Sequence, residues 1–139
     1  MKQRSSHHVF CAVTISAIAA PTDIYAQNQT VEQVAQIIAT QHNQTANMMR
    51  DAMTASSKAS ASGKNVRFEY VLRVKQGLSK SKLQEFDAAN RLEIIPRVCG
   101  VTGNEIGFKR GLSYTFSYTN LFDEKLSEFT VDAKTCGIK

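Results

Sequence analysis

The first folded element that the residue pattern predicts is a long helix. Small and apolar residues recur at helical intervals, at Val31, Val34, Ile38, Thr45, Met48 and Ala52, although the polar run at 41–44 dilutes that face. Thr30 and Gln33 form a capping box, in which each side chain bonds the backbone N–H of the other residue. We therefore expect a helix from Thr30 to about Met53.

A strand follows, after a segment that offers little to bury. Residues 55–65 are almost entirely Ala, Ser, Gly and Lys, a composition that predicts a mobile connection. Between 66 and 75, apolar residues such as Val66, Phe68 and Tyr70 then alternate with mostly polar ones. This period of two predicts a strand with one buried face.

A second helix is predicted from the capping box of Ser81 and Gln84. Its inner side carries Leu83, Phe86 and Ala89 or Asn90. Pro96 disfavours helical angles at the residue before it, so the helix should end before this proline. Residues 100–110 are expected to hold a further short helix around Ile106 and Phe108.

The last third of the chain predicts a hairpin. Residues 112–119 and 125–131 alternate like strands, and a turn of about five residues separates them. The order helix, strand, helix, short helix, strand, strand predicts an α+β fold. In that fold the helices pack on one face of a small antiparallel sheet.

The N-terminal residues have the pattern of a cleavable secretory signal peptide. Lys2 and Arg4 precede a mostly apolar run at 9–20, and Ala26 supplies the small residue expected at a cleavage site. We expect residues 1–26 to be removed. The remaining residues, 27–139, have the length of one ordinary domain, which should work outside the cytoplasm.

The charge of the chain argues against two classes of protein. There are 17 Lys and Arg against 12 Asp and Glu, a net charge of +5 that is spread along the chain. Nucleic-acid-binding proteins usually show a concentrated basic stripe, with aromatic residues among the charges where they bind single strands. No apolar run approaches the roughly 20 residues that cross a bilayer. Neither nucleic-acid binding nor an integral membrane span is predicted.

Two cysteines, Cys99 and Cys136, lie beyond the leader, which contains Cys11. In an exported protein a lone pair of cysteines most often forms a disulfide. Their spacing is not that of a Cys-x-x-Cys redox pair. We predict a structural Cys99–Cys136 disulfide, with free or metal-bound thiols as the alternative.

The residues beyond the leader offer little catalytic chemistry. His42 is the only histidine there, so a Ser-His-Asp triad or a His/Cys metal site would lack partners. We predict no enzymatic activity, no metal and no cofactor. Met48, Met49 and Met53 are candidate partner-binding residues, because thioether side chains repack easily. The alternative is that these methionines belong to the core.

The cysteine region resembles a known family. Gly111 follows Cys99 by twelve residues, Tyr114 comes three later, and Cys136 lies in the sequence TCGI at 135–138. This spacing and ending resemble the AspS-type pilotins of type II secretion systems, also called the GspS-beta group. The resemblance covers about the last forty residues, and elsewhere only the order of the elements agrees.

The resemblance implies a noncatalytic periplasmic α+β domain that grips a short segment at the secretin C-terminus and helps the secretin assemble in the outer membrane. The secretin segment would fold into an apolar groove between the first helix and the sheet. Pilotins of this group are typically lipoproteins, whereas residues 8–10 (HVF) before Cys11 do not form a lipobox, so no lipid anchor is expected. The competing hypothesis is a periplasmic inhibitor or immunity protein that blocks a toxin or a cell-wall enzyme.

Overall fold

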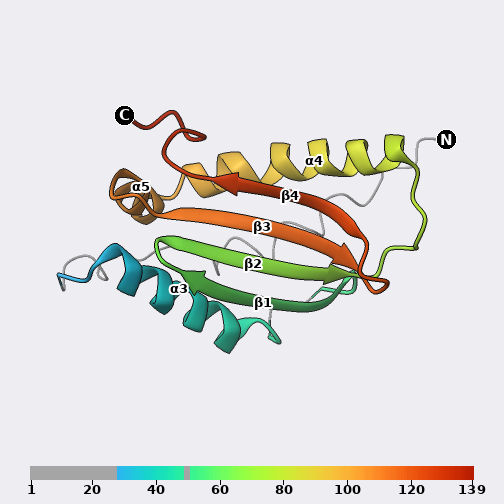
Figure 1. Ribbon diagram of the computed structural model, residues 1–139, viewed down its shortest axis with the longest axis horizontal. Helices are drawn as coiled ribbons and strands as arrows, with labels where there is room; N and C mark the ends of the chain where they lie inside the picture. The colour runs from blue at the N-terminus through green and yellow to red at the C-terminus, as the bar shows by residue number, and fades with distance from the viewer. Residues whose placement is uncertain (1–27, 49–50) are drawn as a thin grey trace.

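The computed structural model describes residues 28–48 and 51–139 (Figure 1). The predicted leader at 1–26 lies outside the described residues. Within them, none of the helices is long and apolar enough to cross a membrane. The elements are, in chain order, α3 (Val31–Thr45), β1 (Thr54–Ser62), β2 (Asn65–Leu72), α4 (Lys80–Cys99), α5 (Thr102–Lys109), β3 (Ser113–Asn120) and β4 (Lys125–Val131).

The sheet has the strand order β1-β2-β3-β4 and is mixed rather than antiparallel. β3 and β4 form the predicted antiparallel hairpin, and β1 also pairs antiparallel with β2, but β2 and β3 run parallel. The physical reason is the connection between β2 and β3, which contains α4 and α5. A helical crossover returns the chain to the end where β2 began, so the next strand enters in the same direction (Figure 1).

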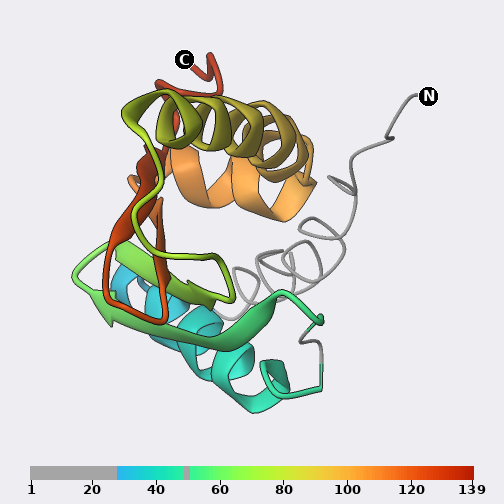
Figure 2. The same cartoon turned by 90° about the vertical axis from the view of Figure 1, so that its right-hand side faces the viewer.

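The predicted α+β fold with helices on one face of the sheet is confirmed. α3 lies over β1 and β2, and α4 lies over β4 on the same side (Figure 2). Between these layers, aromatic rings on neighbouring strands stack in register, Phe68 on Phe116 at 5.2 Å and Tyr70 on Tyr118 at 5.0 Å. Alternation along β2 and β3 therefore builds the core, as the period of two predicted.

The first helix is shorter than predicted. Its capping box is present, with Thr30 and Gln33 bonding each other's backbone N–H at 2.8 and 3.1 Å, but α3 ends at Thr45 instead of near Met53. One cause is Asp51, whose carboxylate accepts hydrogen bonds from the N–H groups of Met53 and Thr54. Such local side-chain bonds favour a turn over a continued helix.

The prediction of a mobile connection at 55–65 is wrong, because most of that segment forms strand β1. A strand satisfies its backbone groups through the sheet ladder, and β1 pairs with β2 from Thr54 to Ser62. Small side chains suit this position under a helix: Ala59 is buried and Ala61 packs against the core. The low hydrophobicity of the segment therefore did not mean disorder.

The second helix also departs from its predicted limits. Ser79, not Ser81, caps it, by accepting from the N–H of Lys82 at 3.2 Å, and α4 continues through Pro96 to Cys99. Pro96 is exposed, and the turn that contains it is held by tertiary contacts of its neighbours. Val98 is buried, and the carbonyl of Val98 accepts from the side chain of Asn104 at 3.0 Å. Those contacts outweigh the local preference that proline imposes.

The predicted disulfide between Cys99 and Cys136 is present, with the two Cα atoms 5.4 Å apart. It joins the end of α4 to the C-terminal segment that follows β4. The expected short helix is α5, whose buried Asn104 accepts a hydrogen bond from the Tyr114 hydroxyl at 2.8 Å. The C-terminal third is thus held together by one covalent and several polar contacts.

Candidate functional site

The methionines predicted to bind a partner lie where α3 gives way to β1. Met48 is 85% exposed in the turn that follows α3, and Met53 is half-buried directly before β1. Met49 lies outside the described residues. The exposure of Met48 places it on the surface and outside the core, so at this position the core alternative does not hold.

The segment that carries Met53 is held against the end of β2. The backbone N–H of Arg73 donates to the carbonyl of Met53 at 2.7 Å. The Arg73 guanidinium donates to the carbonyls of Ala52 and Thr54 at 3.2 and 3.1 Å. These bonds orient the chain at 51–54, so Met53 belongs to an ordered surface.

His42 lies on the buried side of α3, although its sequence neighbours are polar. Its ring packs edge-on against Phe68 and Tyr70, and its Nε2 lies 2.6 Å from the hydroxyl oxygen of Ser57. Burial lowers the pKa of His42 below its ordinary value. The neutral ring therefore joins α3 to β1.

The contact between the Ser57 hydroxyl and His42 resembles the serine–histidine pair of a nucleophilic site. The sequence did not indicate this contact. Such a site also needs a group that orients the imidazole. Within residues 28–48 and 51–139, the Nδ1 atom of His42 has no hydrogen-bond partner. The same part of the chain contains no cluster of His, Cys, Asp or Glu that could hold a metal ion.

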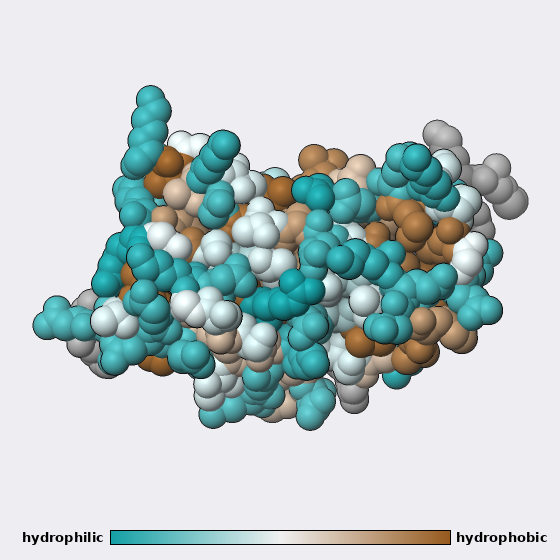
Figure 3. All heavy atoms as spheres, viewed as in Figure 1, coloured by the Kyte–Doolittle hydropathy of each residue, from teal (hydrophilic) through white to brown (hydrophobic). Residues whose placement is uncertain are grey.

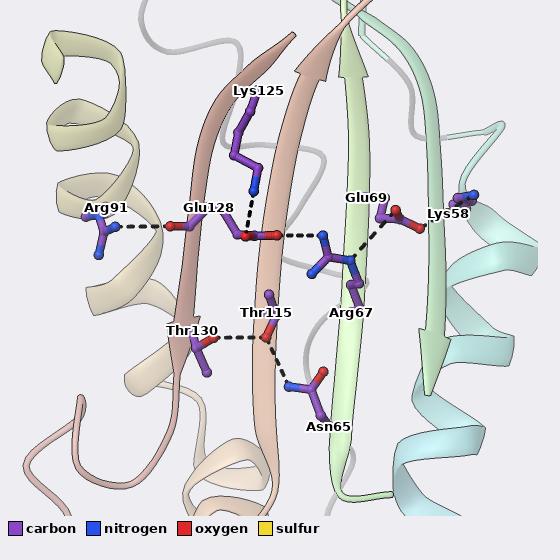
Figure 4. A network of polar contacts seen from close by, with 9 residues as sticks. All are labelled: Lys58, Asn65, Arg67, Glu69, Arg91, Thr115, Lys125, Glu128 and Thr130. Carbon is purple, nitrogen blue, oxygen red and sulfur yellow. Dashed lines mark hydrogen bonds and ion pairs between the residues drawn. The ribbon is translucent and has the colours of Figure 1, made fainter. Parts of the chain in front are cut away.

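The face of the sheet opposite the helices carries a polar network that spans all four strands (Figure 4). The Glu128 carboxylate on β4 accepts from Arg67 at 2.5 Å and from Lys125 at 3.0 Å. Arg67 also pairs with Glu69, which pairs with Lys58 at 3.5 Å. Hydrogen bonds lower the pKa of Glu128, and the bond from Lys125 contributes more than the bond from Arg67. This face of the sheet, which we call the open face, is thus covered by charged side chains that pair with one another.

Apolar side chains on the surface gather away from this network. Figure 3 views the open face and shows hydrophobic atoms at its right-hand end, over the β3–β4 turn and the loop that leads to α4. Leu121 and Phe122, in that turn, are 61% and 57% exposed. Sequence reasoning treated the turn only as a connection. The available signal was a Leu-Phe pair inside an otherwise polar turn.

Comparisons with known proteins give a likeness of fold. No family model matches the chain, and no curated protein matches it. Among solved structures, the Pseudomonas aeruginosa protein PA3611 superposes with a TM-score of 0.61 at 15% identity, over 76% of this chain and 92% of that one. The chain is also similar to two type II secretion pilotins. AspS from Vibrio cholerae has a TM-score of 0.53 at 16% identity, over 76% of this chain and 92% of AspS. EpsS from Vibrio vulnificus has a TM-score of 0.52 at 14% identity, over 76% of this chain and 94% of EpsS. The chain therefore has a pilotin-like fold.

Proposed function

We propose that this chain is a noncatalytic periplasmic protein that acts as a pilotin. It grips the C-terminal segment of a secretin and helps the secretin assemble in the outer membrane. The observation that carries the proposal is the likeness of fold to two type II secretion pilotins over nearly their whole length. The spacing of Cys99, Tyr114 and Cys136, noted in the sequence, supports it independently of the superposition.

The proposed contact surface includes Met48, Met49 and Met53. A secretin tail that is disordered when free must offset its ordering cost by burying apolar side chains. Met48 offers an exposed thioether for that burial, and Met53 lies on a segment already ordered by Arg73. Thioethers adapt to the shape of a partner, which suits recognition of a short peptide.

Fluorescence anisotropy with a labelled peptide from the C-terminus of the secretin of the same organism tests this function. We expect saturable binding, and M48E should weaken it by about tenfold, because a charge replaces a buried apolar contact. L92E is the matched control, since Leu92 is 79% exposed on α4. Absence of peptide binding by the unsubstituted protein would overturn the pilotin proposal. Equal binding by M48E would remove Met48 from the contact surface.

A pull-down from the envelope of the same organism separates the two hypotheses on function. Recovery of a secretin supports the pilotin role. Recovery of a toxin or a wall hydrolase, without a secretin, supports the inhibitor role instead.

The mass of the protein recovered from the periplasm tests the predicted leader. Cleavage after Ala26 without an added lipid gives the mass of residues 27–139 with the disulfide as the single modification.

A further inference from the structure

The β3–β4 turn presents two large apolar side chains side by side to solvent. Leu121 and Phe122 are each more than half exposed, and they are adjacent in the turn between β3 and β4. Scattered apolar residues on a surface need no explanation, but a contiguous pair on a projecting turn suggests a contact.

The turn is held in one conformation by Asn120, which is 2% exposed. Its side-chain oxygen accepts from the N–H groups of Phe122 and Glu124 at 2.9 and 3.0 Å. Its side-chain nitrogen donates to the Glu124 carboxylate at 2.8 Å. Asp123 adopts a left-handed conformation, with φ at 61°. This internal bonding keeps the two apolar side chains outside the core.

The loop before α4 is joined to this turn and brings positive charge to it. The backbone N–H of Gly77 donates to the Glu124 carboxylate at 3.0 Å. Segments 73–82 and 120–125 together contain five cations, Arg73, Lys75, Lys80, Lys82 and Lys125, against two anions, Asp123 and Glu124. Two of these cations pair with carboxylates outside the segments, Lys82 with Glu85 and Lys125 with Glu128, whereas no ion pair within the described residues involves Lys75 or Lys80. The apolar tip therefore has two unpaired lysines on the adjoining loop.

The size and charge of the surface around the β3–β4 turn determine what it can bind. The pocket behind the turn, lined in part by Leu78 and Leu83, measures about 30 Å³, which is too small to hold a large apolar side chain of a partner. Two side chains also supply far less than the roughly 800 Å² per partner of a specific protein interface. A symmetric contact between two copies would bring the same lysines together. Insertion at a bilayer surface needs only a small apolar area with cations beside it.

We propose that the β3–β4 turn is a peripheral membrane contact. Leu121 and Phe122 enter the interfacial region of a bilayer, and Lys75 and Lys80 attract its anionic headgroups. The attraction is reversible and weakens as salt is raised, because mobile ions screen charges at the surface. The contact would hold the chain near a membrane. It does not depend on the proposed binding of a secretin.

A single tryptophan tests the insertion directly, since the chain contains none. F122W, purified from the periplasm, is mixed with vesicles of equal parts phosphatidylcholine and phosphatidylglycerol. We expect its emission to shift to the blue, because the indole leaves water. L92W, on the outer side of α4, is the matched control and should not shift. An unshifted F122W spectrum would overturn the proposal.

Vesicle co-sedimentation measures the two parts of the contact separately. L121S/F122S should lower partitioning by at least about tenfold, and K75Q/K80Q should lower it several-fold. L92S should leave it unchanged. Equal binding to vesicles of phosphatidylcholine alone would contradict the role of the headgroups. Loss of self-association in L121S/F122S, with no vesicle binding by the parent, would assign the tip to contacts between copies and overturn the proposal.

Discussion

The side-chain amide of Asn43 pairs with both backbone groups of Ala59. Its Nδ2 donates to the carbonyl oxygen at 2.8 Å, and its Oδ1 accepts from the N–H at 2.7 Å. Because Ala59 lies on edge strand β1, the amide takes the place of a further strand. At the other edge, Arg91 of α4 donates to the carbonyl of Glu128 at 3.1 Å. Each edge of the sheet thus receives a hydrogen bond from a helix.

The first prediction concerns this protection of the edge. N43A should lower the free energy of unfolding by about 1–2 kcal/mol, because two backbone groups lose their partner. Urea denaturation measures the change. Q44A, an exposed neighbour on the same helix, should change stability by less than about 0.5 kcal/mol.

Combining N43A with R91A leaves both edges without their helix bonds. This double variant should aggregate faster than either single variant in a light-scattering assay at equal fraction folded. If N43A and Q44A proved equally stable, the amide pairing would contribute nothing, and this account of β1 would be wrong.

The disulfide gives a second prediction. It closes a loop of sequence separation 37, so the C99S/C136S variant should be less stable by about 4 kcal/mol in the chain-entropy model. Urea titrations with and without a reductant measure the difference. The reductant should destabilise the parent protein but leave C99S/C136S unaffected. An equal response of the two proteins would show that the bond does not account for the difference.

A third prediction is a dependence of stability on pH that His42 causes. The folded protein holds this ring neutral, because burial lowers its pKa, whereas the unfolded chain titrates near the ordinary value of 6.5. Below about 6.5 the unfolded state therefore binds a proton that the folded state does not, so stability falls as pH falls. The slope cannot exceed about 1.4 kcal/mol per pH unit.

Chemical denaturation between about pH 7.5 and pH 5.5 tests this effect. The other groups packed against the ring are Ser57, Phe68 and Tyr70, and burial raises the pKa of Tyr70, so Tyr70 does not titrate in this range. H42L should remove the slope, while S57A should retain it. A slope that persists in H42L would have to come from another group.

The sequence predicted those parts of the fold in which the pattern of apolar and polar side chains matches their burial. Alternation at Val66, Phe68 and Tyr70 located β2, and the hairpin followed from the same period in β3 and β4. The prediction from the sequence failed at β1. There Ala59 packs under α3 with a methyl group only, and the side chain of Asn43 completes the backbone hydrogen bonds of Ala59. Neither feature produces a hydrophobic pattern.

The candidate site shows the same division. The paired cysteines could be predicted because their chemistry is local and limited to two residues. The buried position of His42 could not, since the polar residues around it hide the fact that its side of α3 faces Phe68. The parallel arrangement of β2 and β3 depends on how α4 and α5 cross the sheet, which no short stretch of sequence encodes.

The last prediction concerns Glu128, which accepts hydrogen bonds from Lys125 and Arg67 on the open face (Figure 4). These bonds lower the pKa of the Glu128 carboxyl, with Lys125 as the larger cause. Stability that comes from this shift is present above the ordinary Glu pKa and is lost as pH falls through the lowered value. K125M should raise the pKa of Glu128, and K125M/R67M should raise it further.

An NMR titration of the Glu128 side-chain carboxyl carbon measures these shifts. K109M is the matched control, because it removes a lysine that pairs with Glu105 at 3.1 Å on α5. K109M should leave the pKa of Glu128 unchanged. An unaltered pKa in K125M/R67M would mean that the cations do not hold the carboxylate in solution, since exposed ion pairs often contribute little. A raised pKa would establish that the network across the open face persists in solution.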